Sequence, residues 1–253
     1  MKFLVIKGED DIRYKYVEEI LKNDGYETTE QVEEADKIIL PMIGCEDGIH
    51  ITGTSIIFDE FLKQVKPGAT LYGGTAPCEV KDYLMERACQ RYNGIPTAEG
   101  LLTYILNNRT ETVWNSDILI LGFGNVAEHL AMILKEMGAR VTVAAFPEEE
   151  IAHAKASGFP AVSTTALADH VGNKDIIVST IPARIIDEQI MDHIDRKTLI
   201  VDTATRKPVM DPEMAKEKGL NYNIVWRIPG TYFPKTAAQI IVDAIYRLMK
   251  NEK

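Results

Sequence analysis

A glycine-rich segment directly after an apolar run constrains this sequence more than any other feature. The apolar run is Ile118-Leu119-Ile120-Leu121, and Gly122, Gly124 and Ala127 follow it in the spacing G-x-G-x-x-A. Apolar residues then recur at helical spacing up to residue 137. A strand, a tight glycine turn and a helix in this order predict a parallel α/β sheet that binds a dinucleotide.

Each position of the turn has a chemical reason. Gly122 permits the sharp bend, and Gly124, which has no Cβ, lets a pyrophosphate approach the helix N-terminus, where N–H groups favour anions. Ala127 is small enough for close helix–strand packing. We therefore predict cofactor contacts from Gly122, Gly124, Asn125, Val126 and Ala127. A tight turn that binds nothing would have the same pattern, so that alternative stays open.

Short apolar runs alternate with helical patterns along most of the chain. The strands that this pattern predicts are residues 3–6, 37–41, 69–72, 118–121, 140–145, 161–164, 175–179, 198–202 and 222–226. The predicted helices are residues 12–21, 55–65, 79–89, 97–106, 125–137, 148–157, 187–193 and 236–249. Such an alternation is typical of βαβ units and mostly parallel sheets.

A polar segment from Asn107 to Ser116 interrupts the alternation and marks a domain boundary. Thr97 is a candidate N-cap for the helix before it, which would connect the two domains. We expect an N-terminal parallel-sheet domain with this connector helix over residues 1–110, a Rossmann domain over 111–234 and a last helix over 235–253. The apolar face of the last helix must be covered, which also favours a homo-oligomer.

Composition excludes several classes of protein. The 253 residues carry 28 Lys and Arg against 38 Asp and Glu, a net charge of −10 that argues against nucleic-acid binding. No apolar run is long enough to span a membrane, and an acidic start argues against a signal peptide, so we expect a cytoplasmic protein. The three cysteines and five histidines show no metal spacing, so no metal is expected.

The residues leave the choice of cofactor open. NAD-binding domains usually carry an Asp or Glu at the end of the second strand, but residues 143–147 read Val-Ala-Ala-Phe-Pro and contain neither a carboxylate nor an arginine. We expect Glu148 to Glu150 to cap the next helix. Phe146 and the strand-ending segment Thr180-Ile181-Pro182 are further candidates for cofactor contact.

Several longer stretches carry a family resemblance over nearly the whole chain. They are Ile38 to Pro41, Tyr92 to Gly100, the glycine turn, Ser179 to Pro182, Thr198 to Asp202 with Arg206, Ile228 to Gly230 and Pro234 to Ala237. With these stretches the chain resembles the A subunit of dipicolinate synthase. The resemblance implies a flavodoxin-like N-terminal domain, a Rossmann domain and a C-terminal helix that packs back on the first domain. It also implies NADP-linked oxidation of a dihydrodipicolinate-level intermediate to dipicolinate during sporulation, together with a second, flavoprotein-like subunit.

The chain departs from this family at several places, among them Arg227, which stands where a small residue is usual, and a shorter N-terminal domain. Phe146 stands where the family carries an arginine, and Arg206-Lys207-Pro208-Val209 replaces Arg-Pro-Gly-Gly. The expected cofactor is therefore NADP or NAD, and only the resemblance favours NADP.

A small dicarboxylate substrate would need fixed cations. Arg206 follows a predicted strand, Lys235 and Thr236 begin the last helix, and Thr97 and Glu99 begin the connector helix, so these five residues are the predicted substrate contacts. Arg206 could instead pair with Asp202 or Asp211, and Lys235 could be solvated. Thr97 could act only as a cap, and Glu99 only as a partner of the helix dipole. The turn after residue 72 is then the alternative substrate site.

No acid/base constellation is visible, and the catalytic residue stays unassigned. The leading interpretation is an NAD(P)-dependent oxidoreductase of the dipicolinate synthase type, in which positioning contributes most of the catalysis. One alternative is another small-acid dehydrogenase, which would need an acid other than histidine because no histidine follows His193. The other is a non-catalytic nucleotide-binding subunit.

Overall fold

The computed structural model describes residues 1–9, 11–203 and 207–251. The chain divides into two compact units, of which unit 1 contains residues 1–96 and 229–253 and unit 2 contains residues 97–228. Sequence analysis places the boundaries at residues 110 and 234, at the polar segment and just before the last helix. In the structure the first boundary, between residues 96 and 97, falls inside the helix Arg87–Asn107. The reason is that Cys89, in the first half of this helix, belongs to the core of unit 1.

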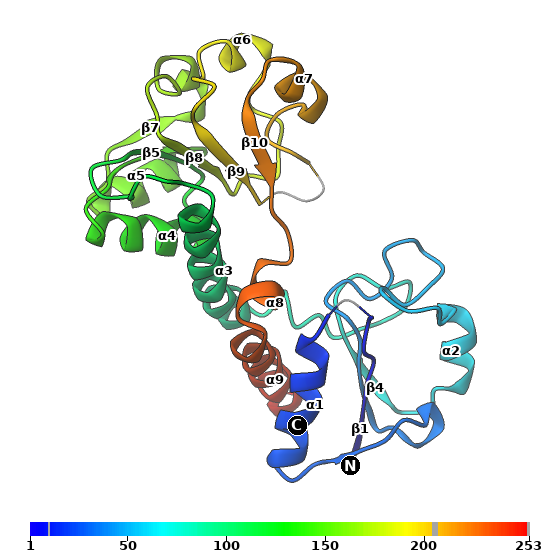
Figure 1. Ribbon diagram of the computed structural model, residues 1–253. Coiled ribbons are helices and arrows are strands. Elements are labelled where there is room, and N and C mark those ends of the chain that lie inside the picture. The colour runs from blue at the N-terminus through cyan, green and yellow to red at the C-terminus, as the bar shows by residue number, and fades with distance from the viewer. Residues whose placement is uncertain (10, 204–206, 252–253) are drawn as a thin grey trace. The chain divides into compact units, whose positions relative to one another are not determined.

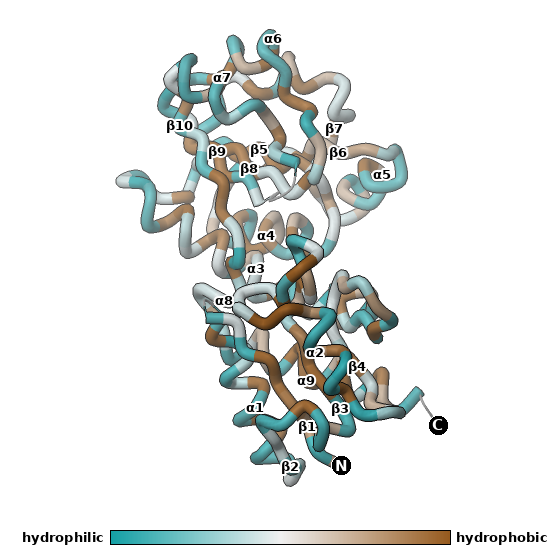
Figure 2. Tube along the Cα trace, turned by 90° about the vertical axis from the view of Figure 1, so that its right-hand side faces the viewer, coloured by the Kyte–Doolittle hydropathy of each residue, from teal (hydrophilic) through white to brown (hydrophobic). Residues whose placement is uncertain are grey.

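Unit 1 is built on a parallel sheet in the order β2-β1-β3-β4, as expected for a flavodoxin-like domain. Its strands are β1 (Lys2–Val5), β2 (Glu27–Thr28), β3 (Lys37–Ile39) and β4 (Thr70–Tyr72). Because successive side chains of a strand point to opposite faces, Phe3 and Val5 pack with helices α1 (Arg13–Asn23) and α9 (Pro234–Lys250). Leu4 packs on the other face with α2 (Phe58–Gln64). In Figure 2 the central strands β1 and β3 of this sheet contain hydrophobic stretches, coloured brown.

The C-terminal helix α9 runs beside α1 in unit 1 (Figure 1). Its apolar face is covered there, because Ala237, Ile241, Ala244 and Ile245 are each at most 1% exposed. The expectation that this helix packs back on the N-terminal domain is therefore confirmed. A short helix, α8 (Ile228–Tyr232), precedes α9, and a 3-10 turn, η1 (Val32–Glu34), precedes β3.

Unit 2 contains a parallel sheet in the order β10-β9-β8-β5-β6-β7, which is the Rossmann order. Its strands are β5 (Asp117–Leu121), β6 (Arg140–Ala145), β7 (Ala161–Ser163), β8 (Ile176–Ser179), β9 (Leu199–Asp202) and β10 (Asn221–Ile224). Its helices are α4 (Asn125–Glu136), α5 (Glu148–Ala156), α6 (Glu188–Met191) and α7 (Pro212–Glu217), with a 3-10 segment, η2 (Thr164–Asp169). The predicted α/β class and both parallel sheets are thus confirmed.

Helix α3 (Arg87–Asn107) corrects two sequence expectations. Residues 79–86 are not helical, because the carboxylate of Glu86 accepts the N–H groups of Ala88 and Cys89 and the helix begins there. The helix also continues through Pro96, so Thr97 lies inside it and is not an N-cap. Proline costs a helix one hydrogen bond, and here burial of Ala98, as of Leu101 and Ile105, offsets that loss.

Candidate functional site

The central strands of unit 2 are paired in register, so that their carboxyl ends lie side by side. Leu121 at the end of β5 pairs with Ala144 of β6 and with Ser179 of β8, and Ser179 pairs with Asp202 of β9. The loops that follow these strands therefore begin at one edge of the sheet. The strand order reverses direction between β5 and β8, and this switch point is where open α/β sheets bind ligands.

Gly122 opens the glycine turn in a conformation that favours glycine. Its φ is +94°, and its N–H donates a 2.8 Å hydrogen bond to the carbonyl of Ala144. A Cβ at this position would lie 2.7 Å from Oγ1 of Thr180 and 3.1 Å from Cγ1 of Ile181. The structure thus brings the first turn glycine together with two residues that sequence analysis assigns to the cofactor.

Gly124 is surrounded by open space. It is the N-cap of α4 with φ −79° and ψ −170°, and a Cβ built there meets no heavy atom within 4 Å. Helix α4 begins at Asn125, so the N–H groups of its first turn lie beside this space. Ala127 is fully buried against the sheet. Room for a ligand next to helix N–H groups fits the pyrophosphate of a dinucleotide.

The segment after β8 is tied to the glycine strand. Thr180 donates both its hydroxyl, at 3.1 Å, and its N–H, at 3.0 Å, to the carbonyl of Leu121. The N–H of Ile181 donates to the hydroxyl of Ser179 at 3.4 Å, and Pro182 is exposed. These bonds hold the Thr180-Ile181-Pro182 segment at the switch point, beside the turn.

Phe146 and Glu150 lie on the other side of the turn. Phe146 is the first residue after β6, and its side chain is 69% exposed. In α5 no side chain caps the helix, and Glu150 instead accepts the N–H of Phe123 at 3.2 Å with Oε2. Glu148 to Glu150 thus lie in the first turn of α5 as expected, but the carboxylate of Glu150 also binds the glycine turn, which was not expected.

The residues that we predict for the substrate lie in different elements, and the structure does not test their role. Lys235 and Thr236 are exposed in the first turn of α9, where Nζ of Lys235 lies 5.3 Å from the centroid of the Tyr16 ring. Thr97 is buried within α3, and Glu99 is exposed. Arg206 lies outside the described residues. The alternative partner for it, Asp211, caps α7 and pairs with Arg184 at 3.1 Å.

Sequence reasoning missed a carboxylate network at the end of β9. Asp202 is fully buried, and its Oδ2 accepts the N–H of Val209 at 2.7 Å and the hydroxyl of Tyr222 at 2.6 Å. Burial, together with the hydrogen bond to this carboxylate, raises the pKa of Tyr222 above its usual range. Asp202 belongs to the stretch from Thr198 to Asp202 that carries the family resemblance. It ends an apolar run, and this position in the sequence could have indicated a buried carboxylate at the end of a strand.

A second missed feature is a buried ion pair in unit 1. Arg13 at the start of α1 is only 5% exposed, and it donates to both oxygens of Asp11, from Nε at 2.8 Å and from Nη2 at 2.6 Å. Its Nη1 faces the sulfur of Met42 at 2.7 Å. The pair ties Asp11 to the start of α1, and an acidic run followed by an arginine in the sequence gives no sign of it.

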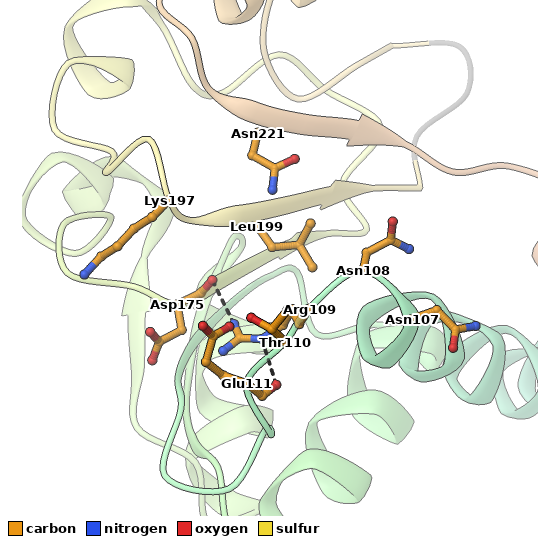
Figure 3. Close-up of a pocket in the computed structure, with 9 residues that line it drawn as sticks. All are labelled: Asn107, Asn108, Arg109, Thr110, Glu111, Asp175, Lys197, Leu199 and Asn221. Atoms are coloured by element: carbon orange, nitrogen blue, oxygen red, sulfur yellow. Dashed lines mark hydrogen bonds between the residues drawn. The ribbon is translucent and has the colours of Figure 1, made fainter.

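A polar pocket of about 460 Å³ lies at the opposite edge of the unit 2 sheet, next to the start of β9 (Figure 3). Arg109 crosses this pocket and donates to the carbonyls of Asp175 and Glu111. None of the predicted cofactor or substrate residues lines it. Among the described residues no cluster of His, Cys, Asp or Glu could hold a metal ion, and no helix is long and apolar enough to cross a membrane.

Fold and glycine turn together give unit 2 the architecture of a dinucleotide-binding Rossmann domain. Residues 103–216 match the family model of the D-isomer specific 2-hydroxyacid dehydrogenase, NAD binding domain. The match covers the glycine turn and the strands from β5 to β9.

More particularly, the chain is similar to the A subunit of dipicolinate synthase. It is 31% identical to that protein from Bacillus subtilis (strain 168) over 158 residues, which are 62% of this chain and 53% of the relative. The aligned part thus spans about half the length of the relative. The expected resemblance is confirmed.

Solved structures extend the similarity in fold. The A chain of dipicolinate synthase from Bacillus subtilis matches with a TM-score of 0.86 and 22% identity over 99% of this chain and 96% of that chain. The same protein from Bacillus halodurans gives 0.86 and 22% over 98% and 97%. Both units therefore have the architecture found in the A subunit of dipicolinate synthase.

Proposed function

We propose that this protein is an NAD(P)-dependent oxidoreductase that oxidises a dihydrodipicolinate-type cyclic dicarboxylate to dipicolinate. The observation that carries the proposal is the open space at Gly124, beside the first turn of α4 and two residues after Gly122, which lies against Thr180. A dinucleotide would supply a hydride acceptor there. The substrate ring would lose a hydride to that acceptor and a proton to solvent, and the product would be an aromatic pyridine.

The chain's own residues would bind and orient the reactants. The N–H groups of Asn125 and Val126 would hold the pyrophosphate, and the segment after β8 would limit the position of the nicotinamide. Arg206, Lys235 and Thr236, with Thr97 and Glu99, remain the proposed contacts of the substrate carboxylates. We also propose that the partner of this chain is a second, flavoprotein-like subunit, because the relative is itself one subunit of a synthase. Self-association of the chain stays a separate prediction, and the apolar face of α9 that suggested it is covered within unit 1.

A second candidate function is a dehydrogenase of another small acid, which the match to the 2-hydroxyacid dehydrogenase model favours. A histidine–carboxylate mechanism of that kind would need a histidine near the switch point. The last histidine, His193, precedes β9, binds the carbonyl of Gln189 at 2.8 Å, and so lies toward the amino end of its strand. This placement supports the first candidate over the second.

The test is turnover of the purified full chain with NAD and NADP, followed at the absorbance band of the reduced cofactor. Freshly prepared dihydrodipicolinate should give reduced cofactor and dipicolinate in equal amounts, whereas 2-hydroxy acids should give neither. Turnover of 2-hydroxy acids alone would favour the second candidate. Binding of a dinucleotide without turnover of any acid, even with the flavoprotein-like partner added, would favour a non-catalytic nucleotide-binding role.

A further inference from the structure

The carboxylate of Glu150 is held at the middle residue of the glycine turn. Its Oε2 accepts the N–H of Phe123 at 3.2 Å, and Phe123 lies between Gly122 and Gly124. Among the described residues, the N–H of Phe123 is the hydrogen-bond donor to the Glu150 carboxylate, so Oε1 keeps its capacity to accept. The neighbouring acids Glu148 and Glu149 are exposed, whereas Glu150 is half-buried.

Packing of the Phe123 side chain fixes helix α5 against the turn. The Phe123 ring is 1% exposed and lies edge-on to the rings of His153, at 5.1 Å, and Phe159, at 5.6 Å. Nε2 of His153 in turn lies 3.5 Å from Glu128 of α4. Glu150 is one helical turn before His153, so its position relative to the glycine turn is set by a packed core and not by one hydrogen bond.

An exposed aromatic ring lies in the segment between β6 and α5, four residues before Glu150. Phe146 follows β6, the strand whose Ala144 accepts the N–H of Gly122, and its ring is 69% exposed. Residues 143–150 include three glutamates and no lysine or arginine. An aromatic face stacks on a base, a carboxylate binds a ribose diol, and no cation in this segment could bind a phosphate.

We propose that Glu150 and Phe146 form the adenosine subsite and that this subsite selects a dinucleotide with a 2′-hydroxyl over one with a 2′-phosphate. The proposal rests on the dinucleotide function proposed above. Oε1 of Glu150 accepts the ribose 2′-hydroxyl, and the same carboxylate repels a phosphate dianion. The usual carboxylate at the end of the second strand is thus replaced by one from the first turn of α5, and the selected cofactor is NAD although the family resemblance implies NADP.

Titration calorimetry of the full chain with NAD⁺ and NADP⁺ tests the subsite without any substrate. Wild type should bind NAD⁺ at least thirtyfold more tightly than NADP⁺. Glu150→Gln keeps the side-chain volume and removes the charge, so it should weaken NAD⁺ about tenfold and strengthen NADP⁺ about tenfold. Phe146→Ala should weaken both about fivefold, because both carry the same adenine.

Glu149→Gln is the matched control, since it removes one charge from the same helical turn at an exposed position and should change the affinity ratio less than twofold. An equal effect of Glu149→Gln and Glu150→Gln would show general charge repulsion and overturn the subsite. A wild-type preference for NADP⁺, or an unchanged ratio in Glu150→Gln, would also overturn it and leave the proposed dinucleotide function standing. Failure of wild type to bind either dinucleotide would overturn both.

Discussion

Both sheets carry a pair of glycines at their carboxyl edge, and the second glycines of the two pairs have opposite surroundings. After β4 of unit 1, a Cβ on Gly73 would lie 2.9 Å from Cβ of Leu40, and a Cβ on Gly74 would lie 1.6 Å from the carbonyl oxygen of Met42. After β5 of unit 2, a Cβ on Gly124 would meet nothing within 4 Å. Glycine thus permits close backbone packing at one edge and leaves space for a ligand at the other.

Charged groups differ between the edges in the same way. Beside α1 of unit 1, both carboxylate oxygens of half-buried Asp11 accept hydrogen bonds from buried Arg13. Beside α5 of unit 2, Glu150 keeps one oxygen for a ligand. Residue types alone therefore do not distinguish a sheet edge that packs against protein from one that leaves room for a ligand. The two edges differ in whether protein atoms already fill the space beside the glycines and already bind the oxygens of the carboxylate.

The strongest test of the packed edge is Gly74→Ala. The new Cβ would overlap the carbonyl oxygen of Met42, and neither group is a flexible side chain that could move aside. We expect a loss of about 4 kcal/mol in the free energy of unfolding, at the upper end of single substitutions. Urea unfolding followed by circular dichroism measures it. A loss below about 1 kcal/mol would show that this edge is as open as the one in unit 2.

Asp11→Ala tests the buried ion pair next. Removing the carboxylate leaves the guanidinium of Arg13 buried, with the sulfur of Met42 as a weak acceptor. Breaking a buried pair on one side costs about 3 kcal/mol, so the same urea measurement should show a loss of that size. The double variant Asp11→Ala with Arg13→Met should recover most of it. No recovery would indicate that the aspartate stabilises the loop by itself.

Gly124→Val should affect binding and leave stability nearly unchanged. The extended backbone at Gly124 suits any residue, and the branched side chain would occupy the space assigned to the pyrophosphate. We expect about a hundredfold loss of NAD affinity, or about 2.7 kcal/mol, with an unchanged melting temperature. Calorimetry and thermal unfolding of the same sample give both values. Unchanged affinity would make the glycine turn purely structural.

The sequence predicted what depends on periodicity and failed where packing decides. The strands from Lys37 onward, helices α4 and α9, and the turn at Gly122 follow from apolar spacing and glycine placement. The start of α3 was missed because a proline usually ends a helix, whereas burial on both sides of Pro96 lets this one continue.

The site divides in the same way. Thr180 is predictable because it ends an apolar run, and register alone brings it beside Gly122. The role of Glu150 could not be predicted, because three consecutive glutamates at the start of a helix do not show which of them binds the N–H of Phe123. That direction is set by the Phe123–His153 packing, which is a tertiary contact.

The smallest expected effect concerns Tyr222, whose hydroxyl donates to buried Asp202 at the edge of unit 2. Tyr222→Phe removes one hydrogen bond to a carboxylate and should cost about 1.5 kcal/mol at pH 7. Burial and this bond raise the pKa of Tyr222 in the folded protein, so the stabilisation is complete below the unfolded pKa of about 10 and falls as the pH rises above it. The stability difference between wild type and Tyr222→Phe should therefore shrink between pH 9 and about pH 11 in urea unfolding. Tyr92→Phe, at an exposed ring, is the control and should show no loss at pH 7. A difference that stays constant across this range would mean that the hydrogen bond to Asp202 does not raise the pKa of Tyr222. The N–H of Val209 would then be the group that stabilises the Asp202 carboxylate at this edge of the sheet.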